Sequence, residues 1–250
     1  MFKLLKKLFK RKDKGADRAF RGESAKSIFN VLTLLTGAVY GELDERLDFR
    51  TALSRALKKP VPPHINFWFC FGGITFLIFL IQVVTGMALL LYYRPTVEQA
   101  FASVVHITNN VPFGWLVRGF HHWGANLIMI TVMIHAMRVF FHGAYKPPRD
   151  FNWVVGTLLM FFLMVFGFSG YLLPWNTLSY WATVVGAEIP GAIPYIGEHI
   201  AYLIKGGDQV GQLALTRFFA FHVVILPFGA LVLLLLHFMM IRRLGISGPL

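Results

Sequence analysis

The chain has 250 residues, of which 56% are hydrophobic and 14% charged, and its mean hydropathy is +0.60. This composition excludes a water-soluble globular domain and predicts an integral membrane protein. The net charge of +12 does not indicate a nucleic-acid-binding protein, because ten of the Lys and Arg residues lie in residues 1–30 and most of the others flank apolar runs, where lipid contact and topology require them.

Residues 1–38 are predicted to form a basic amphipathic extension. The sequence FKLLKKLFK places Phe2, Leu5 and Phe9 on one face of a helix and lysines on the opposite face. Such a helix is expected to lie on the surface of a lipid membrane. The extension has neither the long apolar core nor the small-residue cleavage site of a signal peptide, so we expect it to be retained.

Four apolar stretches are long enough to cross a membrane, which takes about 20 residues of helix. They cover residues 67–93, 119–141, 151–173 and 218–241. Pro174 ends the third stretch, and Pro227 is expected to kink the fourth. The predicted fold class is therefore all-α, an integral membrane bundle of four transmembrane helices.

Residues 175–216, between the third and fourth spans, are too many for a tight turn and are partly apolar, so they predict short helices on the membrane surface. The N-terminal region, the 138–150 loop and the residues after the fourth span are net basic. The excess of Lys and Arg places both termini and this loop in the cytoplasm. Spans two and four then both run from outside to inside.

The single cysteine excludes an intramolecular disulfide, a cysteine-ligated zinc site and a cysteine-held iron–sulfur cluster. Any metal must be held by histidine, by carboxylate or within a prosthetic group.

Histidines on the two parallel spans carry the main functional signal. His121 and His135 are 14 residues apart, and His222 and His237 are 15 apart. At about 100° per residue, each pair stays near one stripe of its helix, with a rise of about 21 Å. Facing spans would pair His121 with His222 near the outer side and His135 with His237 nearer the inner side. Two stacked bis-imidazole sites suit two haem irons with both axial positions filled, which predicts electron transfer.

Glycines in the other two spans repeat this interval. Gly72 and Gly86 are 14 apart, as are Gly156 and Gly170. Glycine lets a flat macrocycle lie against the backbone where a Cβ would collide. The alternative is that these are ordinary small residues at helix packing surfaces. Two glycine pairs in register with two histidine pairs favour the haem interpretation.

An intramembrane histidine can also be a hydrogen-bonding or proton-relay group. Four histidines at this spacing favour haem ligation over that alternative. The remaining histidines have no partner at helical spacing and are expected at interfaces or in loops; they are His64, His106, His122, His142 and His199.

Several segments carry a family resemblance: VPPHINFWFCFGG, FGWLVRGFHHW, MIHAMRVFFHGAYKPPR, FGFSGYLLPW, LTRFFAFHVVILP and HFMMIRRLGISGPL. They resemble cytochrome b6 and, more closely, the short cytochrome b of Firmicute-type quinol:cytochrome c reductases. The resemblance covers about residues 39–250 and implies a four-helix haem domain like the N-terminal part of cytochrome b. The remaining helices are then expected on a separate subunit resembling subunit IV.

The resemblance also implies residue roles. It makes His121 and His222 ligands of a lower-potential b haem near the outer side, and His135 and His237 ligands of a higher-potential b haem near the inner side. Basic positions that meet haem propionates or the haem environment correspond to Arg118, Arg138 and Arg149, and we group Arg242 with them. A guanidinium suits this role because it stays charged and binds a carboxylate with two hydrogen bonds; the alternative is anchoring at the membrane interface.

Cys70 matches the cysteine that, in the resembled family, forms a single thioether to an extra haem beside the inner quinone pocket. The sequence contains no CxxCH motif, so this third haem rests on the resemblance alone. A lone transmembrane cysteine otherwise serves packing.

The implied function is transmembrane electron transfer in a quinol-oxidising bc/b6f-type complex, from an outer quinol site through two b haems to an inner quinone site, coupled to proton translocation. The implied partners are the subunit IV-like second half, a Rieske iron–sulfur protein, a c-type cytochrome subunit, quinol and quinone, and lipid, in a dimeric complex of the bacterial cell membrane. The subunit is expected to be inactive alone.

Two alternatives remain open on the sequence. One is the dihaem cytochrome b subunit of a hydrogenase or formate dehydrogenase, whose histidines are spread over more helices. The other is a proton carrier or scaffold without haem.

Overall fold

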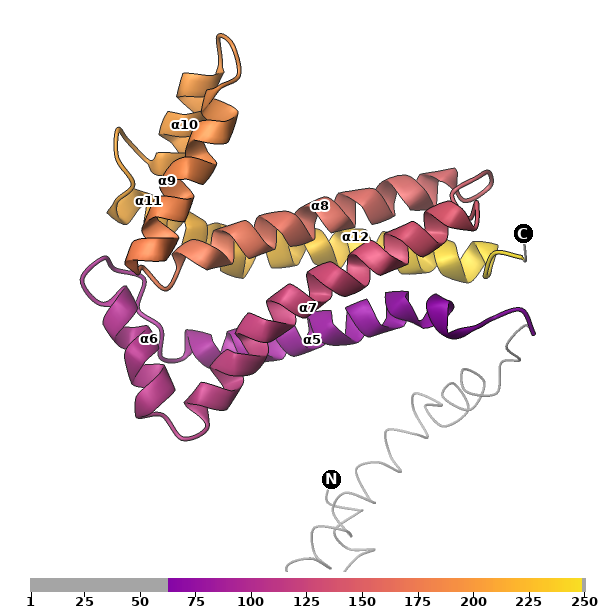
Figure 1. Cartoon of the computed structure of the whole chain (residues 1–250), viewed down its shortest axis with the longest axis horizontal. Coiled ribbons are helices and arrows are strands. Elements are labelled where there is room, and N and C mark those ends of the chain that lie inside the picture. Colours follow the sequence, from indigo (N-terminus) through magenta and orange to yellow (C-terminus); the bar gives the residue numbers. More distant parts are fainter. Residues whose placement is uncertain (1–62, 249–250) are drawn as a thin grey trace, which may run out of the picture. The chain divides into compact units, whose positions relative to one another are not determined.

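The computed structural model describes residues 63–248, and every regular element in this range is a helix (Figure 1). The predicted all-α fold class is confirmed. The predicted extension, residues 1–38, and the first part of the predicted haem domain, residues 39–62, lie outside the described residues.

Four helical segments are long and apolar enough to cross a membrane, which confirms the four predicted spans. They are η1 with α5 (Phe67–Cys70 and Phe71–Leu90), α7 (Gly114–Phe141), α8 (Asp150–Leu172), and a continuous run of α11 (Gln212–Ala220), η2 (Phe221–Ile225) and α12 (Leu226–Leu244). The second and fourth helices extend beyond their predicted bounds. A helix can continue beyond its apolar run into polar sequence until a residue ends it. Gly245, whose φ is 69°, ends α12 in this way.

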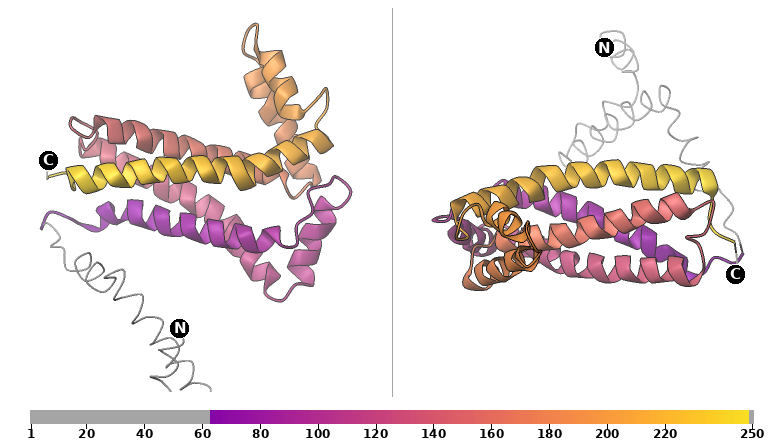
Figure 2. Two further views of the ribbon diagram at one scale, coloured as in Figure 1. Left: turned by 180° about the vertical axis from the view of Figure 1, so that it is seen from behind. Right: turned by 90° about the horizontal axis from the view of Figure 1, so that it is seen from above.

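The four long helices pack as two antiparallel pairs. α5 lies along α7, and α8 lies along α12 (Figures 1 and 2). α7 and α12 run in the same direction, as predicted, and within residues 63–248 their backbones do not pack closely against each other. Contact between these two helices is therefore left to their side chains.

Three shorter helices run crosswise to the long ones at one end of the bundle: α6 (Ala100–Asn109), α9 (Thr177–Gly191) and α10 (Gly197–Lys205) (Figure 1). The short helices predicted in residues 175–216 are confirmed. Asn176 caps α9, because its side chain accepts a hydrogen bond from the Ser179 amide at 2.8 Å. The sequence analysis missed α6, although its buried residues Ala100, Ser103 and Ile107 have helical spacing.

We call the end that carries α6, α9 and α10 the outer end, after the predicted orientation. A small core holds it together. Leu172 at the end of α8 packs with Val210, Ala214 and Phe218, and all four side chains are buried. This core fixes the start of the fourth span against the end of the third.

At the opposite, inner end, the residues that follow α12 fold back over the bundle. Ser247 is buried, its carbonyl lies 2.9 Å from Nε2 of His64, and its hydroxyl accepts a hydrogen bond from Arg138 at 3.2 Å. Arg149 donates to the carbonyls of Leu244 and Ile246, each at 3.3 Å. These bonds tie α7, α8 and the segment before α5 to the end of the fourth span.

The sequence predicts a kink at Pro227, and the structure has a π-helical turn, η2, that ends two residues before it. Proline has no amide hydrogen, and its ring collides with the carbonyl four residues earlier in a regular α-helix. The wider turn provides room for the ring at this point of the span.

Candidate haem sites

His121 on α7 and His222 in η2 form an outer pair. Their ring centroids are 6.3 Å apart, with an interplanar angle of 77°. A metal–imidazole bond measures about 2 Å, and the centre of a five-membered ring lies about 1.1 Å from each of its atoms for bonds of about 1.33 Å. Two imidazoles on opposite sides of one metal ion therefore have centroids about 6 Å apart. The outer pair fits this requirement.

A buried hydroxyl contacts Nδ1 of each outer histidine. Nδ1 of His121 lies 3.0 Å from Oγ1 of Thr85, and Nδ1 of His222 lies 3.0 Å from Oγ of Ser169. With Nδ1 engaged, Nε2 is the ring nitrogen left to bind a metal. The sequence analysis missed both hydroxyls. The signal was available, because Thr85 directly precedes Gly86 and Ser169 directly precedes Gly170.

His135 on α7 and His237 on α12 are the predicted inner pair, and each ring lies against a glycine of the packed helix. Nδ1 of each ring is buried and has no hydrogen-bond partner within residues 63–248. The structure therefore brings the outer rings together, and it surrounds the inner rings differently.

Each of the four predicted glycines lies against one of the four histidine rings. A Cβ added at these glycines would meet Cε1 of a histidine on the packed helix: Gly72 and His135 at 2.9 Å, Gly86 and His121 at 3.2 Å, Gly156 and His237 at 3.3 Å, and Gly170 and His222 at 2.6 Å. The missing Cβ atoms leave room for the imidazole rings in the structure. The predicted role of these glycines beside a macrocycle stays a prediction.

The π-helical turn explains the unequal histidine spacing. In a regular α-helix, 14 and 15 steps of about 100° end on opposite sides of the starting face. A π turn contains an additional residue, and His222 lies within η2. The 15 residues from His222 to His237 therefore span the same helical register as the 14 from His121 to His135.

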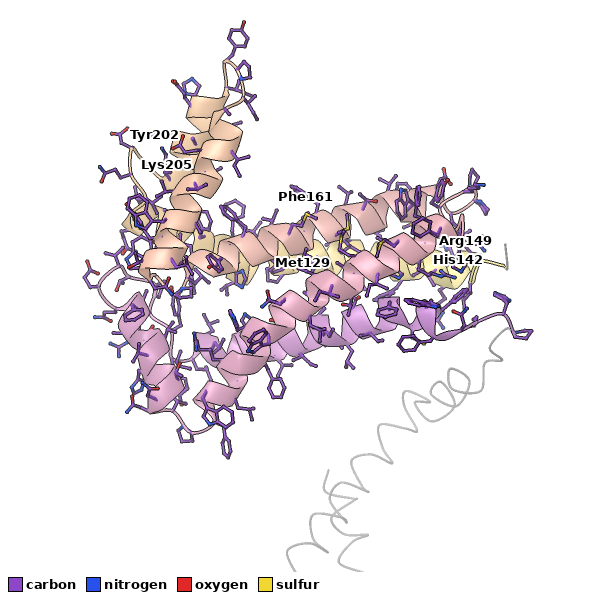
Figure 3. All side chains as sticks on the ribbon, viewed as in Figure 1. Met129, His142, Arg149, Phe161, Tyr202 and Lys205 are labelled. Atoms are coloured by element: carbon purple, nitrogen blue, oxygen red, sulfur yellow. The ribbon has the colours of Figure 1, made fainter. Side chains whose placement is uncertain are left out.

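The inner end holds two of the predicted arginines. The guanidinium carbon of Arg138 lies 3.4 Å from the centroid of the Phe69 ring. Figure 3 shows Arg149 and His142 together at this end of the bundle. The Nε atoms of Arg138 and Arg149 are buried and have no hydrogen-bond partner in the described range. Buried N–H groups of this kind fit a carboxylate acceptor.

The other predicted residues, Arg118, Arg242 and Cys70, differ in burial and in their distance along the chain from the histidine pairs. Arg118 is half-buried on α7, one turn before His121, and Arg242 is exposed near the end of α12. Cys70 is exposed and directly precedes α5. It lies two residues before Gly72, which contacts the inner pair.

The remaining histidines form no pair of facing rings among residues 63–248. His64 contacts Ser247, and His142 directly follows α7. His106, His122 and His199 are exposed on helices.

A bare metal ion needs more protein ligands than this arrangement offers. Among residues 63–248, no group of three or more His, Cys, Asp or Glu side chains could hold one. Paired imidazoles leave the other coordination positions to a prosthetic group, as a haem does.

A family model described as cytochrome b/b6/petB matches residues 56–245 of the chain. The chain belongs to the cytochrome b family. Among its relatives are the cytochromes b6 of Synechococcus elongatus and of Auxenochlorella protothecoides, which are 46% and 45% identical over 212 residues. Each alignment covers 85% of this chain and 99% of the relative.

A solved structure of a hyperthermophilic respiratory Complex III contains a similar chain. The TM-score is 0.77 at 37% identity, and the alignment covers 84% of this cytochrome b and 56% of that chain. This cytochrome b thus matches about half of the solved chain.

These relationships confirm the family resemblance. The protein is a multi-pass membrane cytochrome b of a family with b-type haems, and it is an electron-transfer subunit of a quinol-oxidising bc/b6f-type complex. They favour this interpretation over the hydrogenase or formate dehydrogenase alternative and over a carrier without haem.

The glycine contacts predict graded effects of a single methyl group. Gly170→Ala should displace the His222 ring, cost about 1–3 kcal/mol of stability and lower the amount of bound haem. Gly156→Ala should do less, because its Cβ would lie 3.3 Å from the His237 ring rather than 2.6 Å. Haem per polypeptide and thermal stability measure both effects. Gly167→Ala on the same helix is the control, since no atom lies within 4 Å of its Cβ; equal effects for all three variants would contradict the assignment.

Proposed function

We propose that His121 and His222 bind one b-type haem and that His135 and His237 bind a second, making this cytochrome b the transmembrane electron conduit of its complex. The observation that carries the proposal is the 6.3 Å separation of the outer imidazoles. When bound, a haem with both axial positions filled supplies a one-electron couple and no open position for oxygen or substrate.

The arginines would bind the acidic groups of these haems. The unpartnered Nε atoms of Arg138 and Arg149 support this role at the inner end, because a propionate would supply the missing acceptors. Arg118 would serve the outer pair, since it lies one turn from His121. Arg242 is the weakest member of the set, because its side chain is exposed.

An open groove of about 730 Å³ between α8 and α9 would form this chain's part of the outer quinol site. Phe168, Trp181 and Val185 are among the residues that line it, and its surface is almost entirely apolar, as a quinol with an isoprenoid tail requires. Phe168 is two residues from Gly170, which contacts His222. This proximity would let a bound quinol donate an electron at the outer pair. The matching quinone site would lie at the inner end.

Large apolar surfaces support assembly with other subunits and with lipid. Leu77, Val84, Phe161 and Phe228 are all more than half exposed on the long helices. We assign these surfaces to lipid, to a subunit IV-like protein that supplies the second half of the cytochrome, and to the second copy in a dimer. A Rieske iron–sulfur protein and a c-type cytochrome complete the proposed complex.

Cys70 would carry a third haem. Its thiol would add across one vinyl double bond of that haem, forming a single thioether without loss of any atom. The exposed position of Cys70 near the inner pair supports this assignment.

The proposed location is a bacterial cell membrane, with both termini and the 138–150 loop in the cytoplasm. The Lys and Arg distribution supports this orientation.

Removing one ligand from each pair tests the haem assignment. His222→Ala and His237→Ala should each lower the extractable haem from two to one per polypeptide, because each iron loses an axial bond. Pyridine haemochrome analysis of the purified complex measures this ratio. His199→Ala, an exposed histidine on α10, is the matched control. Two extractable haems in either ligand variant would refute the assignment of that residue.

The Cys70→Ser variant tests the thioether. In the unmodified protein, haem should remain with the polypeptide after acid–acetone extraction and on a denaturing gel. The variant should release it and keep both extractable haems, because an exposed residue before α5 supports neither histidine pair. Complete extraction of haem from the unmodified protein would return Cys70 to a packing role.

Phosphatase fusions test the orientation. Alkaline phosphatase inserted at Asp208, in the connection between α10 and α11, should be active because that connection faces outward. The same insertion at Lys146, in the connection between α7 and α8, should be inactive. The reverse pattern would invert the proposed topology.

A further inference from the structure

Each of the four histidines contacts a glycine, but the residue that precedes this glycine differs between the outer and the inner pair. Each outer glycine is directly preceded by a hydroxyl residue, Thr85 or Ser169, and both hydroxyls are buried. Each inner glycine is directly preceded by an apolar residue, Phe71 or Val155. The four positions repeat at the same 14-residue interval, so the two ends of the bundle offer the same backbone setting with different side chains.

The position of each proton sets the direction of the hydrogen bonds between the outer hydroxyls and the histidine rings. A hydroxyl carries one proton, and Thr85 donates it to the Ile81 carbonyl at 2.6 Å. Ser169 donates its proton to the Phe166 carbonyl at 3.2 Å. With Nε2 bound to iron, as proposed, the ring proton lies on Nδ1 of His121 and of His222. Toward these imidazoles both hydroxyl oxygens then act as acceptors.

No hydroxyl contacts the inner rings among the described residues. Nδ1 of His135 and of His237 is buried without a hydrogen-bond partner among the described residues. Val155 occupies the position next to Gly156 that Ser169 occupies next to Gly170, and its side chain is buried but cannot accept a hydrogen bond.

A hydrogen bond from the second ring nitrogen fixes the tautomer of a ligating histidine and raises its basicity. A more basic imidazole donates more electron density to a metal and favours its oxidised state. We propose that Thr85 and Ser169 are positioning residues that make the outer histidines stronger donors than the inner ones and thereby give the outer centre the lower midpoint potential. This inference rests on the proposed function, because it requires that the two pairs bind haem.

Redox titration of the two b haems in the purified complex, followed by absorbance, tests the proposal. Thr85→Val and Ser169→Ala should each shift the outer potential upward, and the double variant should shift it further, while the inner potential stays unchanged. Thr85→Ser retains the hydroxyl and should restore the original value. Thr131→Val is the control, because this buried hydroxyl on α7 bonds only to the Ile128 carbonyl in the described range.

The reciprocal variant is Val155→Thr, which changes little volume and adds a hydroxyl beside Gly156. It should lower the inner potential and leave the outer one unchanged. This variant keeps the proposal testable even if loss of the Thr85 hydroxyl prevents assembly.

The outcomes separate the proposal from the haem assignment. If the ligand variants lose haem as expected but the hydroxyl variants leave both potentials unchanged, the haem sites stand and the proposed role of Thr85 and Ser169 is wrong. If the hydroxyl variants shift both potentials equally, the effect is structural and the proposal is also overturned. If His222→Ala keeps two extractable haems, the proposed function itself fails.

Discussion

Contact between a glycine and a histidine ring sets the geometry of the bundle. α5 meets α7, and α8 meets the fourth span, at two such contacts each, one near either end of the pair. Because glycine has no Cβ, each imidazole lies against the backbone of the neighbouring helix and is held there. The rings of the two helix pairs then face each other with 6.3 Å between the outer centroids. The same glycine–histidine contacts therefore fix both the packing of the helices and the positions of the proposed haem ligands.

Much of this arrangement could be predicted from the sequence. Long apolar runs define the four spans, because crossing a membrane requires a minimum length of apolar helix. Regular helical geometry converts the spacings of four histidines and four glycines into shared stripes. The structure pairs the outer rings and places each of the four rings against a glycine. The Cβ positions of the four glycines point at imidazole rings, a contact that periodicity alone does not reveal.

Other features depend on local chemistry that periodicity does not reveal. α6 is short and only half-apolar, so hydropathy over a window long enough to find a span misses it. The π turn before Pro227 changes the register by one residue, and a calculation that assumes a regular helix cannot include it. The hydrogen bonds of Thr85 and Ser169 to histidines arise from side-chain directions across two helices. A hydroxyl residue beside a glycine in the sequence predicts such a hydrogen bond only when the position of the histidine ring on the packed helix is known.

The positions of the bonded residues along the chain also determine when each contact can form during synthesis on the ribosome. Thr85 and His121 belong to the first two spans and can meet as soon as those spans are in the membrane. Ser247, in contrast, joins His64 and Arg138, which are made far earlier. The inner end therefore stays open until translation has passed the fourth span. The contacts that join α7 and the segment before α5 to the end of the fourth span are thus among the later ones to form as the chain is made.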